Sequence, residues 1–157
     1  MRPFCIYYHN NLNILRPKTY MSDFCITKLR SVRRGKFSQL RYDNQPIELL
    51  FENCVIVREM YDNNKYVRLD LSKSSGDRGA LLKIHEYIKD AVNPNFSPLK
   101  YAAENKSWDD IVCKISNAYW DPFEKYLNKG DKVDVILTVG AFGSFGWCLN
   151  VKKIWCK

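Results

Sequence analysis

A period-2 pattern lies within residues 129–140, in the last quarter of the chain, where four apolar residues alternate with Asp134, Ile136 and Thr138. The apolar members occupy every second position: Val133, Val135, Leu137 and Val139. A strand with one buried face has this period, because successive side chains point to opposite faces of a sheet. We therefore predict a strand here, then a connection of glycines and aromatic residues over 141–146, and a second strand over 147–155.

Three stretches in the first half of the chain also favour strands. One begins at Ile26, a second covers residues 47–60, and a third covers residues 65–71, where apolar and polar positions again alternate. Turn-forming residues separate these stretches: Arg34-Gly35-Lys36, Asp43-Asn44 and Asp62-Asn63-Asn64.

Two stretches in the middle of the chain favour helices. In the first, apolar residues recur at helical spacing and stop before Asn93-Pro94: Leu81, Ile84, Ile88 and Ala91. In the second, Ser107 is the expected N-cap, with two aspartates in the first turn. Its expected buried stripe is Trp108, Ile111, Ile115 and Tyr119, and Asp121-Pro122 ends it.

The order of these elements is strands, two helices and strands again. It predicts a mainly β, α+β domain: a small antiparallel barrel of the OB kind, with both helices between the N- and C-terminal strands. We expect this domain over residues 21–157. Residues 1–20 are polar and irregular, and Met21 is a second candidate initiator. We expect them to be a dispensable extension or an upstream misannotation; a tail docked on the barrel is the alternative.

Composition favours a folded protein with an anionic partner. The hydrophobic content is 46%, and 25 Lys and Arg against 17 Asp and Glu give a net charge of +8. This excess favours nucleic acid or an anionic membrane surface. No apolar run approaches the ~20 residues of a membrane-spanning helix, and the N-terminus is too polar for a signal peptide. The six cysteines lack a disulfide-rich spacing, so we predict the cytosol or nucleus, with no membrane partner.

One basic run stands out within this charge. Between Thr27 and Arg41 the sequence has six cations and no acidic residue: Lys28, Arg30, Arg33, Arg34, Lys36 and Arg41. A charge run is usually a solvated face, but this one lacks the interleaved carboxylates of ordinary surfaces. We predict that it contacts phosphates.

Aromatic residues beside cations supply the second ingredient of single-strand binding, which is a set of faces on which bases stack. The stacking candidates are Tyr42, Tyr66, Phe142, Phe145 and Trp147. Nearby cations would add phosphate contacts: Arg58, Arg68, Lys152 and Lys153. The alternative is that these aromatics are the core of a closing hairpin, and we assign Trp108 and Trp155 to the core.

No catalytic constellation emerges from the sequence. His85 sits beside Glu86, but adjacent helical residues point in different directions. His9 lies in the irregular N-terminal segment, and no Cys or His pair has metal-ligand spacing. The three-residue spacing of Gly140, Gly143 and Gly146 fits neither a dinucleotide fingerprint nor a P-loop. We therefore predict no enzyme activity, metal or cofactor, and keep a nuclease as the third hypothesis.

The spaced fragments over residues 24–155 resemble a known family. The fragments are a basic lead-in with L-x-Y, a polar turn and an apolar strand at 35–51 (GKFSQLRYDNQPIELLF), then LDLS at 69–72, GDKVDV at 130–135 and GWCLNVKKI at 146–154. This order resembles the OB-fold single-stranded DNA-binding proteins of large eukaryotic DNA viruses, which are distantly similar to phage-type binding proteins.

The resemblance implies non-catalytic, sequence-independent binding of single-stranded DNA in viral DNA replication, recombination or repair. Many such proteins have Gln-Thr-Pro where this chain has Glu52-Asn53-Cys54, and phage-type relatives recruit replication proteins through an acidic C-terminal tail that does not follow Trp155 here. RNA binding and a viral accessory factor for a protein partner remain alternatives. Exposed strand edges favour homo-oligomers.

Overall fold

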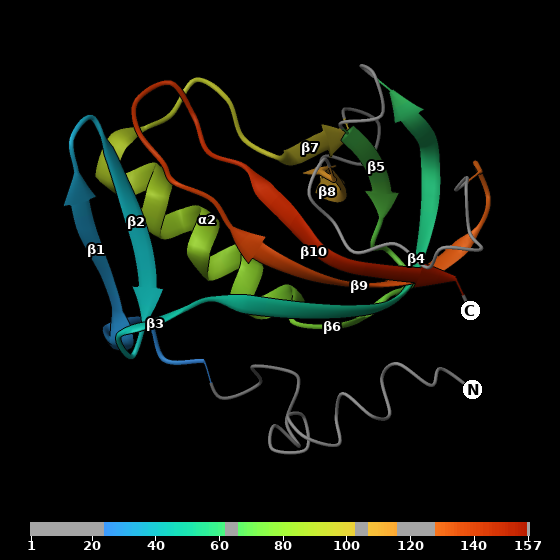
Figure 1. Cartoon of the computed structure of the whole chain (residues 1–157), viewed down its shortest axis with the longest axis horizontal. Helices are drawn as coiled ribbons and strands as arrows, with labels where there is room; N and C mark the ends of the chain where they lie inside the picture. Colours follow the sequence, from blue (N-terminus) through green and yellow to red (C-terminus); the bar gives the residue numbers. More distant parts are fainter. Residues whose placement is uncertain (1–23, 62–65, 103–106, 116–127, 157) are drawn as a thin grey trace.

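The computed structural model describes residues 24–61, 66–102, 107–115 and 128–156 (Figure 1). A 3-10 turn, η2 (Ile26–Lys28), comes first, and a small separate sheet of three strands follows: β1 (Leu29–Arg34), β2 (Phe37–Tyr42) and β3 (Gln45–Pro46). The remaining elements are β4 (Glu48–Tyr61), β5 (Tyr66–Asp70), β6 (Ser75–Gly76), α2 (Arg78–Val92), β7 (Leu99–Ala102), β8 (Ser107–Lys114), β9 (Lys132–Val139) and β10 (Leu149–Cys156). Residues 1–20, predicted to be an extension, lie outside the described residues, as does the turn predicted at 62–64.

Five strands close into a barrel in the order β4, β5, β8, β10, β9 and back to β4. Four of the five seams are antiparallel, and the fifth, between β8 and β10, is a short parallel pairing of Leu149 with Cys113 and of Asn150 with Lys114. The mainly β class and the barrel are confirmed. The expectation of a wholly antiparallel barrel is wrong at this one seam.

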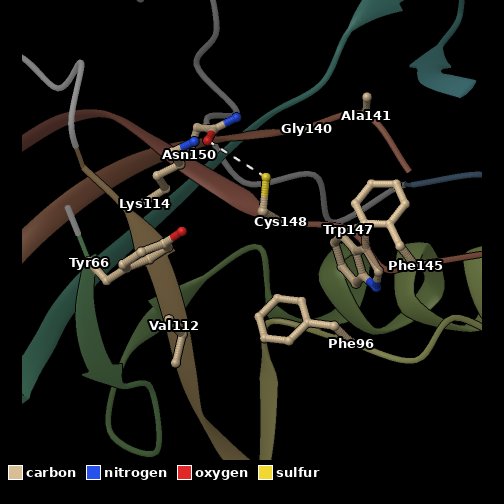
Figure 2. A pocket seen from close by; sticks show the side chains of 10 residues that line it. All are labelled: Tyr66, Phe96, Val112, Lys114, Gly140, Ala141, Phe145, Trp147, Cys148 and Asn150. Carbon is tan, nitrogen blue, oxygen red and sulfur yellow. Dashed lines mark hydrogen bonds between the residues drawn. The ribbon is translucent and has the colours of Figure 1, made fainter. Parts of the chain in front are cut away.

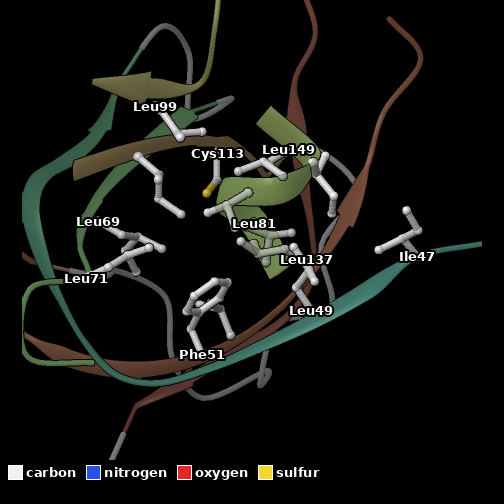
Figure 3. Packing of buried hydrophobic residues seen from close by; sticks show 14 of the residues in the cluster. Ile47, Leu49, Phe51, Leu69, Leu71, Leu81, Leu99, Cys113, Leu137 and Leu149 are labelled. Carbon is white, nitrogen blue, oxygen red and sulfur yellow. The ribbon is translucent and has the colours of Figure 1, made fainter. Parts of the chain in front are cut away.

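The barrel interior follows the period-2 pattern. The inward positions of the strands are fully buried: Leu49, Phe51, Val67, Leu69, Ile111, Cys113, Val133, Val135 and Leu137. Figure 3 shows Leu81 of α2 among barrel side chains such as Leu137 and Leu149. The helix therefore completes the core, and its other buried residues are Ala80, Ile84 and Ile88.

The helix predicted from Leu81 onward is confirmed as α2. It ends where Asn93 takes a left-handed conformation (φ 46°) before Pro94, which matches the expected stop signal. Ala91, expected on the buried stripe, is exposed. Asp77 ties the start of the helix to β4, because its carboxylate accepts a hydrogen bond from the Leu50 N–H at 2.8 Å.

The helix predicted from Ser107 is wrong. Residues 107–114 form β8, which pairs with β5 along one edge and with β7 and then β10 along the other. Ile111 and Ile115 fit helical spacing, but with Cys113 they also fit a period of two, and all three are buried. The pairing of this segment with β5, β7 and β10 favours the strand period of two over the helical period. The described residues thus contain one α-helix, and the stretch predicted as loop at 95–105 contributes β7.

The small sheet packs on the barrel through few residues. We call its β1–β2 hairpin the arm, residues 29–42. Leu29 and Leu40 join the common core, whereas the rest of β1 is exposed. The arm is fixed to the β9–β10 connection by two backbone hydrogen bonds of 2.8 Å, which Ser38 and Phe142 exchange.

Candidate nucleic-acid interface

A pocket of about 590 Å³ lies on the outer face of the barrel, where β5, β8 and the β9–β10 connection meet (Figure 2). Its volume falls in the ~300–1,000 Å³ range of ligand sites. Ten residues line it: Tyr66, Phe96, Val112, Lys114, Gly140, Ala141, Phe145, Trp147, Cys148 and Asn150.

Strand alternation places every second side chain of β5 and β8 on this outer face. Val67 and Cys113 point into the core, so Tyr66 and Lys114, each one residue away, point outward. These two residues are directly opposite in the β5–β8 ladder. Asn150 of β10 lies opposite Lys114 across the parallel seam, so the seam brings a third polar side chain to the pocket.

The pocket has an aromatic end and a polar end. Figure 2 shows the rings of Phe96, Phe145 and Trp147 gathered at one end, with Lys114 and Asn150 at the other and the Tyr66 hydroxyl directed between them. Cys148 lies between the ends and donates a long hydrogen bond of 3.8 Å from its Sγ to the Asn150 Oδ1. Burial raises the pKa of the Cys148 thiol against a smaller opposing effect of Lys114, so this thiol stays protonated at neutral pH.

The β9–β10 connection reaches this position because a glycine permits a close approach. Gly146 has a φ of 148°, and a Cβ on it would lie 2.7 Å from the Cβ of Phe96. The backbone of Trp147 also donates a hydrogen bond to the Phe96 carbonyl at 3.3 Å. A side chain at position 146 would therefore prevent this close approach of the two backbones.

The three aromatic residues predicted to stack from the β9–β10 connection differ in how deeply they are buried. Phe145 is 53% exposed at the pocket, whereas Phe142 and Trp147 are only 2% and 1% exposed and belong to the core. The expectation that Phe142 and Trp147 project as stacking faces is wrong, because both rings complete the packing beneath the connection. Trp155 is buried at 8% exposure, which confirms its assignment, and the side chain of Trp108 lies outside the described residues.

The predicted cations occupy three separate regions. Arg30, Arg33, Arg34, Lys36 and Arg41 all lie on the arm. The arm reaches the pocket through Phe37, whose ring meets that of Phe145 edge to face with centroids 5.2 Å apart. The structure therefore brings together the basic run and the aromatic connection.

The other predicted residues are engaged elsewhere. Tyr42 stacks on Phe24, with ring centroids 4.5 Å apart, and its hydroxyl accepts a hydrogen bond from the Cys25 N–H. Arg68 forms an ion pair with Asp110 at 2.8 Å. Arg58 lies opposite Arg68 in the β4–β5 ladder.

The two lysines predicted on the last strand lie outside the pocket lining. Lys152 pairs with Glu48, and Lys153 is half-buried at a bulge of β10. Tyr66 and Phe145 are thus the predicted residues that line the pocket with accessible rings.

The sequence alone did not predict Phe96, Lys114 and Asn150, whose side chains help to form the two ends of the pocket. Phe96 lies in a segment without periodicity, so no signal marked it. Lys114 lies in the stretch that was predicted to be a helix. Because a helix has no strand partners, the place of Lys114 beside Tyr66 could not be inferred. The alternation of Ile111, Cys113 and Ile115 was the signal that would have placed Lys114 on an outer strand face.

Comparisons with known protein families, with curated proteins and with solved structures give no match. The site must therefore be interpreted from its own geometry. No helix in the described ranges is long and apolar enough to cross a membrane. Within the same ranges, no three His, Cys, Asp or Glu residues gather as metal ligands, and the cysteines described are free thiols.

Proposed function

We propose that this protein binds single-stranded DNA without catalysis, in the pocket on the outer face of its barrel. The observation that carries this proposal is the pocket's division into an aromatic end and a cationic end. Rings such as Phe145 offer stacking that is worth ~1–3 kcal/mol per base and is tolerant of sequence. Lys114 offers a charge for the adjoining phosphate.

The position of the pocket on the barrel supports the same proposal. Barrels of the OB kind have five strands and bind oligonucleotides on strands 2 and 3 and the loops between strands 1 and 2 and strands 4 and 5. Numbered in chain order, the barrel strands are β4, β5, β8, β9 and β10, so β5 and β8 are the second and third, and the β9–β10 connection joins the fourth and fifth. The barrel is compatible with an OB fold, and the pocket lies where such folds bind a strand.

The sequence resemblance adds a role to this binding. By that resemblance the protein would coat single strands during viral DNA replication, recombination or repair. RNA offers the same phosphates and base faces, so it competes with DNA in the proposal.

Quenching of tryptophan fluorescence by oligo(dT) tests the proposal, because Trp147 lines the pocket. Titrations at two salt concentrations, with single-stranded DNA, duplex DNA and RNA as competitors, should show salt-sensitive binding that duplex DNA displaces poorly. If six cations contact phosphates, the log–log salt slope is roughly −4, at about −0.7 per contact. Absence of binding to any single strand at low salt would remove the proposal.

A matched pair of variants locates the binding. Lys114→Gln should weaken oligo(dT) binding, because Lys114 lines the pocket. Lys132→Gln removes the same charge from an exposed position at the far end of β9 and should leave affinity unchanged. Equal effects of the two variants would place the binding elsewhere.

Exposed rings around the pocket favour one second candidate, a protein-interaction surface. Phe37, Phe96 and Phe145 are each more than 40% exposed, and such clusters mark protein contacts as well as base stacking. A protein partner held by these rings would bind with little dependence on salt, which distinguishes it from a nucleic acid.

A further inference from the structure

The arm presents two faces of different character. Residues directly opposite in an antiparallel pair share a face. One face contains the pairs Leu29–Tyr42, Ser31–Leu40 and Arg33–Ser38, and it packs toward the core through Leu29 and Leu40. The other, which we call the outer arm face, contains the pairs Arg30–Arg41, Val32–Gln39 and Arg34–Phe37.

The outer arm face concentrates positive charge without compensation. Arg30 lies directly opposite Arg41, an arrangement that is unfavourable between like charges unless an anion intervenes. Within the described residues, no carboxylate forms an ion pair with Arg30, Arg34 or Arg41. A surface of this kind gains stability when it binds an anionic partner.

Two of the three guanidinium groups on this face, those of Arg30 and Arg41, are already oriented by hydrogen bonds. Arg30 donates from one nitrogen to the Leu29 carbonyl at 2.8 Å, and Arg41 donates to the Gln39 Oε1 at 3.3 Å. Holding a long side chain in place reduces the entropy lost on binding. The remaining N–H groups suit phosphate oxygens, which arginine binds in a bidentate manner.

This face is continuous with the pocket. Phe37 belongs to the outer arm face and is 43% exposed, and its ring contacts that of Phe145 at the pocket edge. The backbone bonds between Ser38 and Phe142 fix the arm against the connection, so this junction has a defined geometry. At ~3.3 Å per residue, the six residues of β1 make an outer arm face about 20 Å long, and Phe37 at one end of it contacts the pocket.

We propose that the outer arm face is a second binding surface for the same single strand. Nucleotides that leave the pocket pass the Phe37–Phe145 pair, and Arg30, Arg34 and Arg41 bind their phosphates. This inference rests on the proposed function. It adds that binding has two parts, a pocket that short oligonucleotides fill and an arm that only longer ones reach.

Two oligonucleotide lengths separate these parts. Oligo(dT) of about 5 nucleotides should occupy the pocket alone, and oligo(dT) of about 20 nucleotides should reach the arm, given site sizes of ~4–16 nucleotides per OB fold. The arm variant is R30Q/R34Q/R41Q. The control is K73Q/K129Q/K132Q, which removes three exposed charges from positions outside the arm and so matches the change in net charge.

The arm variant should bind the longer oligonucleotide more weakly, with a salt slope smaller by about 2, since three contacts contribute about 0.7 each. Its affinity for the shorter oligonucleotide should stay within about twofold of wild type, as any residual effect would then be long-range and screened. The control variant should resemble wild type with both lengths. Equal behaviour of the arm and control variants would overturn the proposal.

Other outcomes separate this inference from the proposed function. If wild type binds neither oligonucleotide, the proposed function and the arm surface both fall. If wild type binds both lengths and the arm variant weakens neither, or both equally, the arm proposal alone falls. A poly(Glu) peptide that binds wild type but not the arm variant, with the longer oligonucleotide unaffected, would assign the arm to an acidic protein partner instead.

The single variant Arg34→Gln tests the proposal even if the triple substitution unfolds the arm. The structure shows no hydrogen bond from the Arg34 side chain to any described residue, so its replacement should leave the hairpin intact. The expected result is a salt slope smaller by about 0.7 with the longer oligonucleotide only. An unchanged slope in this variant, with the arm folded by circular dichroism, would count against the proposal.

Discussion

At the scale of single residues, burial separates rings that the sequence placed together. Phe142, Phe145 and Trp147 share one short connection with no hydrophobic period, so nothing in the sequence indicates which of them points outward. The structure buries the first and third and leaves Phe145 53% exposed. Tyr66 could be assigned to an outer face from the sequence, because it lies in an alternating strand.

Alanine substitution should separate these roles. Trp147→Ala should lower the free energy of unfolding by about 3–5 kcal/mol, the range for a buried aromatic. Phe145→Ala should change stability by less than about 1 kcal/mol and weaken oligo(dT) binding by about 1–3 kcal/mol, the value of one stacked base. Urea denaturation and anisotropy titration measure the two effects. Unchanged oligo(dT) affinity of Phe145→Ala would contradict the stacking role.

His85 should make stability depend on pH. Burial lowers the pKa of this histidine against a smaller opposing effect of Glu86, and its ring lies 6.4 Å from that of Trp147. The folded state therefore favours neutral imidazole, whereas the unfolded chain titrates near ~6.5. Below that pH the unfolded state binds more protons, so this contribution to stability is present above about pH 6.5 and is lost as the pH falls.

Urea unfolding at about pH 7.5 and about pH 5.5 checks this dependence, since the interval spans the ordinary histidine range. The loss of stability at the lower pH should be smaller in His85→Gln than in wild type. His9→Gln, which changes the other histidine of the chain, is the control. An identical loss in wild type and His85→Gln would refute the role of His85.

At the scale of elements, the sequence predicted the helix α2 and the longer strands other than β8. The predicted strands over 47–60 and 65–71 correspond to β4 and β5, and the two terminal strands correspond to β9 and β10. The failure at β8 is instructive, because Ile111 and Ile115 satisfy both periods. Only the partners of β8, which are distant in sequence, resolve the ambiguity. Short strands such as β6 leave no pattern at all.

Gly76 shows what such a short strand requires. It has a φ of 144°, and a Cβ on it would lie 2.1 Å from the Leu50 carbonyl oxygen where β6 pairs with β4. Gly76→Ala should lower the free energy of unfolding by about 1–3 kcal/mol or more, because strain and a backbone clash combine. Gly79→Ala is the matched control in α2, where nothing lies within 4 Å, and should be neutral or stabilise by about 0.4–1 kcal/mol. Urea unfolding of both variants is the measurement.

At the scale of the whole molecule, the barrel class, the basic run and the aromatic connection could be predicted from the sequence. The contact between the basic run and the connection could not. The basic run and Phe145 lie about a hundred residues apart, and only the contacts between the arm and the β9–β10 connection join them. Lys114 and Asn150 come together across the β8–β10 seam. Neither contact leaves a local signature, so the assembled pocket was beyond prediction.

The arm and the barrel should also differ in local stability. β1 has one partner strand and a single buried side chain, whereas β9 has two partner strands and five buried side chains. Amides in such thinly packed segments open more readily. Hydrogen exchange followed by mass spectrometry should show faster exchange in β1 than in β9, and slower exchange of the arm when the longer oligonucleotide binds. Equal protection of β1 and β9 without ligand would contradict this expectation.

The parallel seam between β8 and β10 has a consequence for synthesis on the ribosome. On the edge of β8 that faces away from β5, residues 113–114 pair with residues 149–150, so the ring cannot close until β10 has emerged from the exit tunnel. Until then, the nascent chain presents the unpaired edges of β8 and β9, which invite association with other chains. Contacts this distant in sequence also slow folding. Pairing of β10 with β8 and β9 thus removes the exposed edges through which the nascent chain could aggregate.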